Sequence, residues 1–133
     1  MARAGSTPDK LVQTIDFAST MLALAGVRDT VRRQRTSLVP LLSGRPVSWR
    51  SSLFLEYYTD IVFPRTFRMG YDAVRTERHT YIVYRELPGM DELYDLQRDP
   101  YQMDNLIGTS RAEAVLPGVR ADLQWLITAA SAR

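Results

Sequence analysis

One stretch of the sequence gathers aromatic and cationic side chains that could bind an anion or a sugar. Residues 59–69 contain Arg65 and Arg68 and directly follow two tyrosines, Tyr57 and Tyr58. Guanidinium groups bind sulfate and phosphate through paired hydrogen bonds, and aromatic rings add flat contact surface. A packed surface loop has the same composition, and that interpretation is favoured. If the chain contacts a substrate, we expect Tyr58, Arg65 and Arg68 to make the contact.

A second basic group lies between residues 28 and 35. Its four members are Arg28, Arg32, Arg33 and Arg35. A phosphate or a sulfated glycan could bind there. No aromatic residues are interleaved with these arginines, so a solvated face is the favoured interpretation.

Other residue types that carry chemistry are scarce. His79 is the only histidine and falls in a predicted strand, where a packed or exposed role is favoured over acid–base work. The chain has no cysteine, which excludes disulfides and thiolate sites. No nucleophile elbow or glycine-rich phosphate loop occurs, and the aspartates are scattered over turns and helices. The sequence therefore predicts no catalytic residue and no metal ligand in this chain.

Size and charge are those of an ordinary globular protein. The chain has 133 residues, of which 45% are hydrophobic and 24% are charged, and its net charge is +2. These values predict one small domain or part of a larger one. A nearly balanced charge does not imply nucleic-acid binding, and no run of apolar residues is long enough to span a membrane.

Four short segments rich in aromatic and β-branched residues predict strands, at residues 52–58, 71–76, 80–84 and 93–96. Glu77-Arg78 and Pro88-Gly89 give tight connections, and short connections favour antiparallel neighbours. After the fourth strand, Pro100 ends the extended backbone and Leu106 returns to the core. Polar side chains are expected to hold the turns between them: Asp95, Asp99, Asp104 and Asn105.

Helical periodicity marks both ends of the chain. Residues 16–26 have apolar residues around most of the circumference, with Gly26 as the expected terminator, so this helix should be buried on more than one side. From Ser110 we expect one turn of helix, a break at Pro117-Gly118, and a final helix through Ala130 that packs on the sheet. Trp125 falls off its apolar stripe, which comprises Val119, Leu123, Leu126, Ile127 and Ala130. The predicted fold class is α+β.

Several of these segments resemble sulfatases of the alkaline-phosphatase superfamily. Residues 92–106 are similar to the family run E-L-Y-D-L-x-x-D-P-x-E-x-x-N-L, with Gln102 in place of glutamate. Residues 16–27 look like D-L-x-P-T-L-L-x-L-A-G-V, with Ser19 at the proline. Residues 36–44 look like G-R-S-L-L-P-L-L-x-G, with Arg35 about where that motif has glycine. Residues 74–82 look like V-R-T-x-R-Y-K-Y-I, with Thr80 in place of lysine. The segments occur in family order.

This resemblance implies that residues 1–48 are the tail end of a large α/β domain, whose edge includes the first helix. Residues 49–133 would be the carboxyl-terminal subdomain, a four-stranded antiparallel sheet with a packed helix. A complete sulfatase hydrolyses sulfate esters with a formylglycine made within C/S-x-P-x-R and with calcium or a similar divalent cation. Neither that motif nor a cation site is found in this sequence. We therefore expect a catalytically incomplete fragment whose partners are an N-terminal sulfatase domain and a sulfated substrate, expected to be a carbohydrate.

A second hypothesis treats the chain as a stand-alone module that binds an anionic glycan or a partner protein. The two hypotheses differ in what they expect of the helix at residues 16–26. A fragment should leave apolar surface of this helix uncovered, whereas a self-sufficient module should not. The sequence alone leaves the natural substrate and the cellular compartment open.

Overall fold

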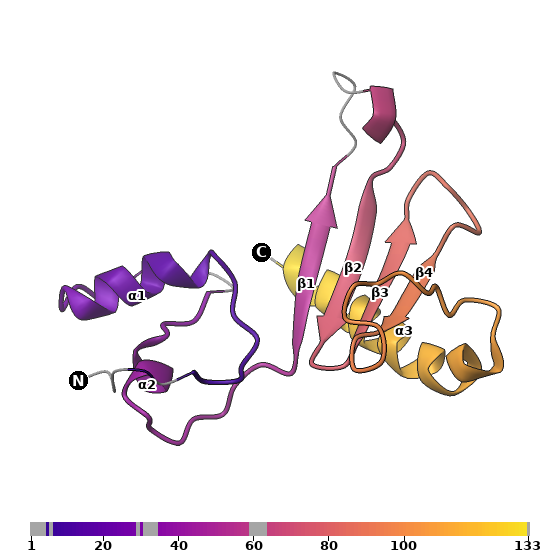
Figure 1. Ribbon diagram of the computed structural model, residues 1–133. Coiled ribbons are helices and arrows are strands. Elements are labelled where there is room, and N and C mark those ends of the chain that lie inside the picture. The colour runs from indigo at the N-terminus through magenta and orange to yellow at the C-terminus, as the bar shows by residue number, and fades with distance from the viewer. Residues whose placement is uncertain (1–4, 6, 29, 31–34, 59–63, 133) are drawn as a thin grey trace. The chain divides into compact units, whose positions relative to one another are not determined.

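The structure is a computed structural model in which residues 5, 7–28, 30, 35–58 and 64–132 are described. The chain divides into two compact units, Met1–Arg50 and Ser51–Arg133. Figure 1 shows the helices and strands of both units.

The carboxyl-terminal unit is built on a four-stranded sheet. Its strands are β1 (Ser52–Tyr57), β2 (Tyr71–Thr76), β3 (His79–Tyr84) and β4 (Glu92–Asp95). They follow one another in the sheet as they do in the sequence, and each pair is antiparallel. The predicted α+β fold with four antiparallel strands is confirmed, and each strand end lies within one residue of its predicted position.

Tight turns set the order of the strands, as the sequence predicted. Two residues separate β2 from β3, and the Thr76 hydroxyl accepts a hydrogen bond from the backbone N–H of His79 at 2.8 Å. Between β3 and β4, Gly89 has φ +82°, a backbone angle that favours glycine. A longer connection joins β1 to β2 and contains the short 3-10 helix η1 (Pro64–Thr66).

The tail forms one continuous helix, α3 (Ser110–Ser131), so the predicted break at Pro117-Gly118 is wrong. Proline removes one backbone hydrogen bond and normally costs a helix about 3 kcal/mol. Here Ala112 lies before Pro117 and Val119 and Leu123 lie after it, and all three are buried. Because both halves pack on the same sheet, tertiary packing outweighs the local cost.

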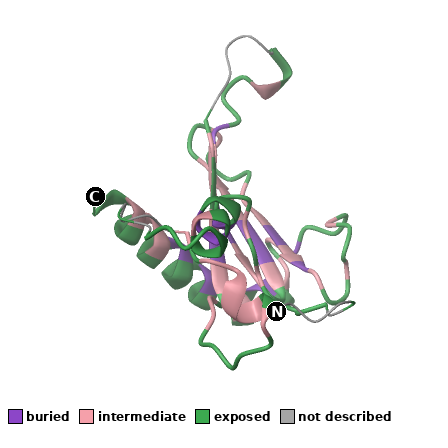
Figure 2. Cartoon of the chain, turned by 90° about the vertical axis from the view of Figure 1, so that its left-hand side faces the viewer, coloured by how far each residue is buried: buried purple, intermediate pink, exposed green. Residues whose placement is uncertain are grey.

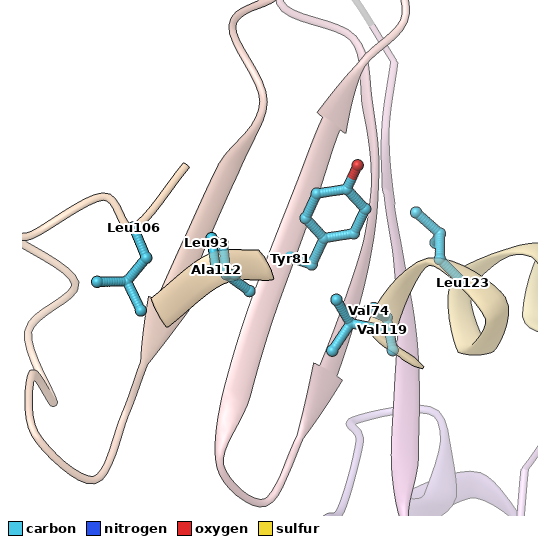
Figure 3. Close-up of a cluster of buried hydrophobic side chains, with 7 residues drawn as sticks. All are labelled: Val74, Tyr81, Leu93, Leu106, Ala112, Val119 and Leu123. Atoms are coloured by element: carbon cyan, nitrogen blue, oxygen red, sulfur yellow. The ribbon is translucent and has the colours of Figure 1, made fainter. Parts of the chain in front are cut away.

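The core lies between α3 and one face of the sheet. Figure 3 shows Val74, Tyr81 and Leu93 from three neighbouring strands facing side chains of the helix. In Figure 2 much of the visible surface of α3 is exposed, and buried residues gather in the strands and on the side of α3 next to them. The cluster is completed by Leu106, Ala112, Val119 and Leu123.

The segment after β4 is held by its polar side chains, as predicted. The Asp99 carboxylate accepts a hydrogen bond from the backbone N–H of Asp104 at 2.8 Å. The Asn105 side-chain oxygen accepts hydrogen bonds from the backbone N–H groups of Leu93 and Ile107, each at 3.0 Å. These bonds place Leu106 in the core, where it is buried.

The amino-terminal unit contains two helices, α1 (Asp16–Leu24) and α2 (Val39–Leu42). Gly26 ends α1 with φ +69°, and the N–H of Val27 donates to the carbonyl of Leu22 at 2.9 Å, which is the Schellman arrangement. The buried residues of α1 are the polar Asp16, Ser19 and Thr20. Its large apolar side chains are instead exposed: Phe17, Met21 and Leu24.

The Asp16 carboxylate joins three parts of this unit. It accepts hydrogen bonds from the backbone N–H groups of Gln13 and Thr36, each at 2.9 Å. The Arg50 guanidinium binds both of its oxygens, at 2.7 and 2.8 Å.

Of the predicted basic group, Arg32 and Arg33 lie outside the described residues. Among the described residues, no helix has the length and apolar character needed to cross a membrane.

Candidate functional site

Tyr58 directly follows β1 at the end of the sheet where the connection to β2 begins. Its side chain is 69% exposed, yet it has two defined contacts. The hydroxyl donates a hydrogen bond to Glu56 Oε1 at 3.2 Å. The Arg85 guanidinium carbon lies 4.7 Å from the centre of the ring. This geometry is a cation–π contact, so the exposed ring has a preferred orientation.

Arg85, the residue after β3, is the centre of an ionic cluster. Its guanidinium forms a bidentate pair with Asp72 of β2, in which Nε lies 2.9 Å from Oδ2. A second carboxylate, that of Glu56, lies 3.6 Å away. The hydrogen bonds from Arg85 to Asp72 raise the pKa of the guanidinium above its usual value. Two carboxylates therefore share one cation beneath the Tyr58 ring.

Arg68 and Arg65 lie on the connection between β1 and β2. The guanidinium of Arg68 donates to the carbonyl of Glu86 at 3.2 Å and lies 3.7 Å from the carboxylate of that residue. Its φ of +62° is uncommon for a residue with a side chain. Arg65 lies in η1 with an exposed side chain.

Tyr58 contacts Arg85 and Arg68 contacts Glu86, and these two partners are consecutive in the chain. Of the residues proposed from sequence, Tyr58 and Arg68 are thus anchored at the same end of the sheet, and the substrate-binding role of all three stays a prediction. Sequence reasoning missed Arg85, which faces Asp72 only because β2 and β3 pair in a particular register. The arrangement offers an aromatic surface with nearby cations, and its described residues include no nucleophile paired with a base.

A second ionic group lies at the opposite end of the sheet, where β3 begins and β4 ends. The Arg78 guanidinium binds both oxygens of Asp95, at 3.2 and 2.9 Å. His79 is paired with Asp95 across the strands, and burial lowers the pKa of its imidazole despite the neighbouring carboxylate. Asp95 also accepts a hydrogen bond from the backbone N–H of Gln97 at 3.2 Å. These contacts hold the start of β3 to the end of β4, which is a structural role.

The Asp95 pair should make stability depend on pH. The hydrogen bond from Arg78 lowers the pKa of Asp95 from 3.8 to about 2. A lowered pKa in the folded state adds stability that is present above pH 3.8 and is lost as the pH falls towards 2. We expect Asp95→Asn to cost about 1–2 kcal/mol at neutral pH. Thermal unfolding of both proteins across this range should show the difference shrinking in acid, and a constant difference would contradict this assignment.

A family model described as "N-sulphoglucosamine sulphohydrolase, C-terminal" matches residues 1–129. The chain belongs to this sulfatase family. A curated relative, the N-acetylglucosamine-6-O-sulfatase of Bacteroides thetaiotaomicron, is 31% identical over 109 residues, which are 80% of this chain and 19% of the relative. The resemblance noted in the sequence is therefore confirmed.

Solved structures of sulfatases share the fold. A 2-O GAG sulfatase superposes with a TM-score of 0.80 at 26% identity, over 96% of this chain and 27% of that protein. A protein solved in complex with its substrate, D-glucosamine-2-N,6-O-disulfate, has a TM-score of 0.73 at 26% identity, over 84% and 23% of the two chains. The chain thus spans about a fifth to a quarter of the length of these sulfatase relatives.

The described residues of this sulfatase domain do not fit the cation site that the resemblance implies for a complete enzyme. Within the described part of the chain, no three acidic, histidine or cysteine side chains come together in a group that could hold a metal ion. Several carboxylates are instead paired with arginines, as in Asp16 with Arg50 and Asp95 with Arg78. These carboxylates therefore form ion pairs with arginine and do not act as ligands of a metal cation.

Proposed function

We propose that this chain is the carboxyl-terminal part of a sulfatase that acts on a sulfated carbohydrate, and that it is inactive alone. The observation that carries the proposal is the uncovered apolar face of α1. Phe17, Met21 and Leu24 are 54%, 64% and 65% exposed. Their spacing of four and three residues puts them on one side of the helix. Such a surface is typical of an interface with another protein part.

The occupant that fits this face is the larger sulfatase domain. The relatives are about four to five times as long as the stretch they share with this chain, so they contain a large region with no counterpart here. In this proposal residues 1–48 complete the edge of that α/β domain through α1. Residues 49–133 form the carboxyl-terminal subdomain.

The substrate is proposed from two sources. The relatives are named as sulfatases of N-acetylglucosamine and glycosaminoglycan, and one was solved with a disulfated glucosamine. In this chain, Tyr58, Arg65 and Arg68 offer the aromatic and cationic surface that such a sugar requires. Formylglycine and a calcium-like cation would be supplied by the larger domain.

Sulfate release tests the proposal. We expect no inorganic sulfate from D-glucosamine-2-N,6-O-disulfate with the 133-residue chain alone. We expect turnover when the chain is co-expressed with a sulfatase N-terminal domain that carries formylglycine. Met21→Lys should abolish this complementation, because it places a charge in the apolar interface. Ala121→Lys, which adds the same charge to an exposed position of α3, should leave it unchanged.

Two results would contradict the proposal. Turnover by the chain alone would show that it is catalytically complete. Absence of turnover in the co-expressed pair, from a chain that is monodisperse and unfolds cooperatively by itself, would favour a stand-alone binding module.

A further inference from the structure

Tyr58 combines high exposure with a fixed orientation. The Arg85 guanidinium covers one face of the ring at 4.7 Å, and Glu56 accepts a hydrogen bond from the hydroxyl at 3.2 Å. The residue as a whole is 69% exposed, so the ring is accessible to a ligand from the solvent side. A ring that is already ordered loses little side-chain entropy when a ligand stacks on it.

Arg85 itself is poorly suited to bind a sulfate group. Its guanidinium is paired with both oxygens of Asp72, and Glu56 lies 3.6 Å away. It also donates to the backbone carbonyl of Tyr57 at 3.4 Å. An incoming sulfate would have to displace these carboxylates or approach them against their negative charge. The contacts instead fix the guanidinium beneath Tyr58.

The chemistry of the open ring face indicates what part of a ligand it contacts. The face of an aromatic ring carries negative electrostatic potential, so it disfavours a sulfate oxyanion. The same face accepts C–H groups, which one side of a pyranose ring presents. The ring therefore suits the carbon framework of a sugar, and the sulfate must be bound elsewhere.

We propose that Tyr58 stacks on the C–H face of a substrate sugar and that Arg85, held by Asp72, is the residue that positions it. This inference rests on the proposed function, because the sugar is that of the sulfated substrate. Arg85 acts through Tyr58 and does not touch the ligand. Its removal should therefore weaken sugar binding only as far as it releases the tyrosine ring.

Binding to the 133-residue chain, followed by NMR, tests the proposal without any turnover. D-Glucosamine-2-N,6-O-disulfate is titrated into the protein, and inorganic sulfate is titrated separately. We expect saturable shifts at Tyr58 with the sugar and none there with sulfate. Arg85→Ala and Tyr58→Ala should each weaken sugar binding about 5- to 20-fold. The double variant should be no weaker than either single variant, because both remove the same contact.

Control variants separate positioning from a general loss of structure. Tyr58→Phe keeps the ring and should bind within about 2-fold of the wild type. Arg111→Ala removes an exposed arginine that pairs with Asp104 and should bind as the wild type does. Additive effects of the two alanine substitutions would overturn the positioning role of Arg85. Sugar binding that neither substitution weakens, or the absence of sugar binding, would overturn the site itself. Sulfate release by the assembled enzyme is measured separately from sugar binding. A failure of the proposed function can therefore be told apart from a failure of this inference.

Discussion

Replacing Arg50 with methionine is expected to destabilise the amino-terminal unit by about 3–5 kcal/mol. The Asp16 carboxylate is fully buried, and Arg50 provides its only ion pair within the described residues. Methionine keeps much of the side-chain volume but leaves a buried charge without its counter-ion. Removing one partner of such a pair costs more than the pair contributes, because the remaining charge stays desolvated.

The same substitution should change how the stability of this unit depends on pH. Burial alone raises the pKa of Asp16, but the hydrogen bonds from Arg50, Thr36 and Gln13 outweigh burial and lower it. The wild-type contribution is thus present above pH 3.8 and is lost as the pH falls. Without Arg50, only the hydrogen bonds from Thr36 and Gln13 oppose burial, so the pKa of Asp16 should be higher in the variant than in the wild type. The difference in stability between the two proteins should therefore shrink in acid, because a protonated Asp16 needs no counter-ion.

Trp49 provides a local probe for this experiment. The chain has two tryptophans, so Trp125→Phe leaves Trp49 as the only one. The indole N–H of Trp49 donates to the carbonyl of Leu11 at 2.7 Å within the same unit, and its fluorescence should report unfolding there. Arg45→Ala, an exposed arginine in this unit, should change stability by less than about 0.5 kcal/mol. Equal effects of Arg45→Ala and Arg50→Met would show that the buried pair has no special role.

Local sequence signals predicted the sheet because its strands are joined by short connections. Alternating apolar residues, the two-residue turn before His79 and the glycine at position 89 together define antiparallel neighbours. Pro117 misled the prediction for the opposite reason. Its effect depends on packing between α3 and strands that lie more than twenty residues before Pro117, which no local pattern contains.

The candidate site was predictable only in part for a similar reason. Tyr58, Arg65 and Arg68 are close in sequence, so composition alone drew attention to them. Arg85 is separated from Asp72 by thirteen residues and from Tyr58 by twenty-seven. These residues meet because β1 ends, β2 begins and β3 ends at the same end of the sheet. Only the register of the strands reveals that an arginine supports the tyrosine ring.

Replacing Leu93 with alanine is expected to destabilise the carboxyl-terminal unit by about 3 kcal/mol. Leu93 is fully buried between the sheet and α3, and truncating it removes apolar contacts and leaves a cavity. Its backbone also anchors the segment after β4, since its carbonyl accepts a hydrogen bond from the N–H of Leu106 at 2.8 Å. The loss should therefore loosen Leu106 as well, in a single cooperative transition.

Leu55→Ala is the matched control, because it makes the same change on the other face of the sheet, at a position 38% exposed. That variant should lose about 1 kcal/mol or less of unfolding free energy, because folding removes less apolar surface from water at this position. Urea unfolding followed by far-ultraviolet circular dichroism measures the stability of both variants. In a Trp49→Phe background, the fluorescence of Trp125 gives a second probe. A cost for Leu55→Ala equal to that for Leu93→Ala would mean that the α3 side of the sheet does not dominate stability. The opposite face would then have to be packed as tightly in solution as the core in Figure 3.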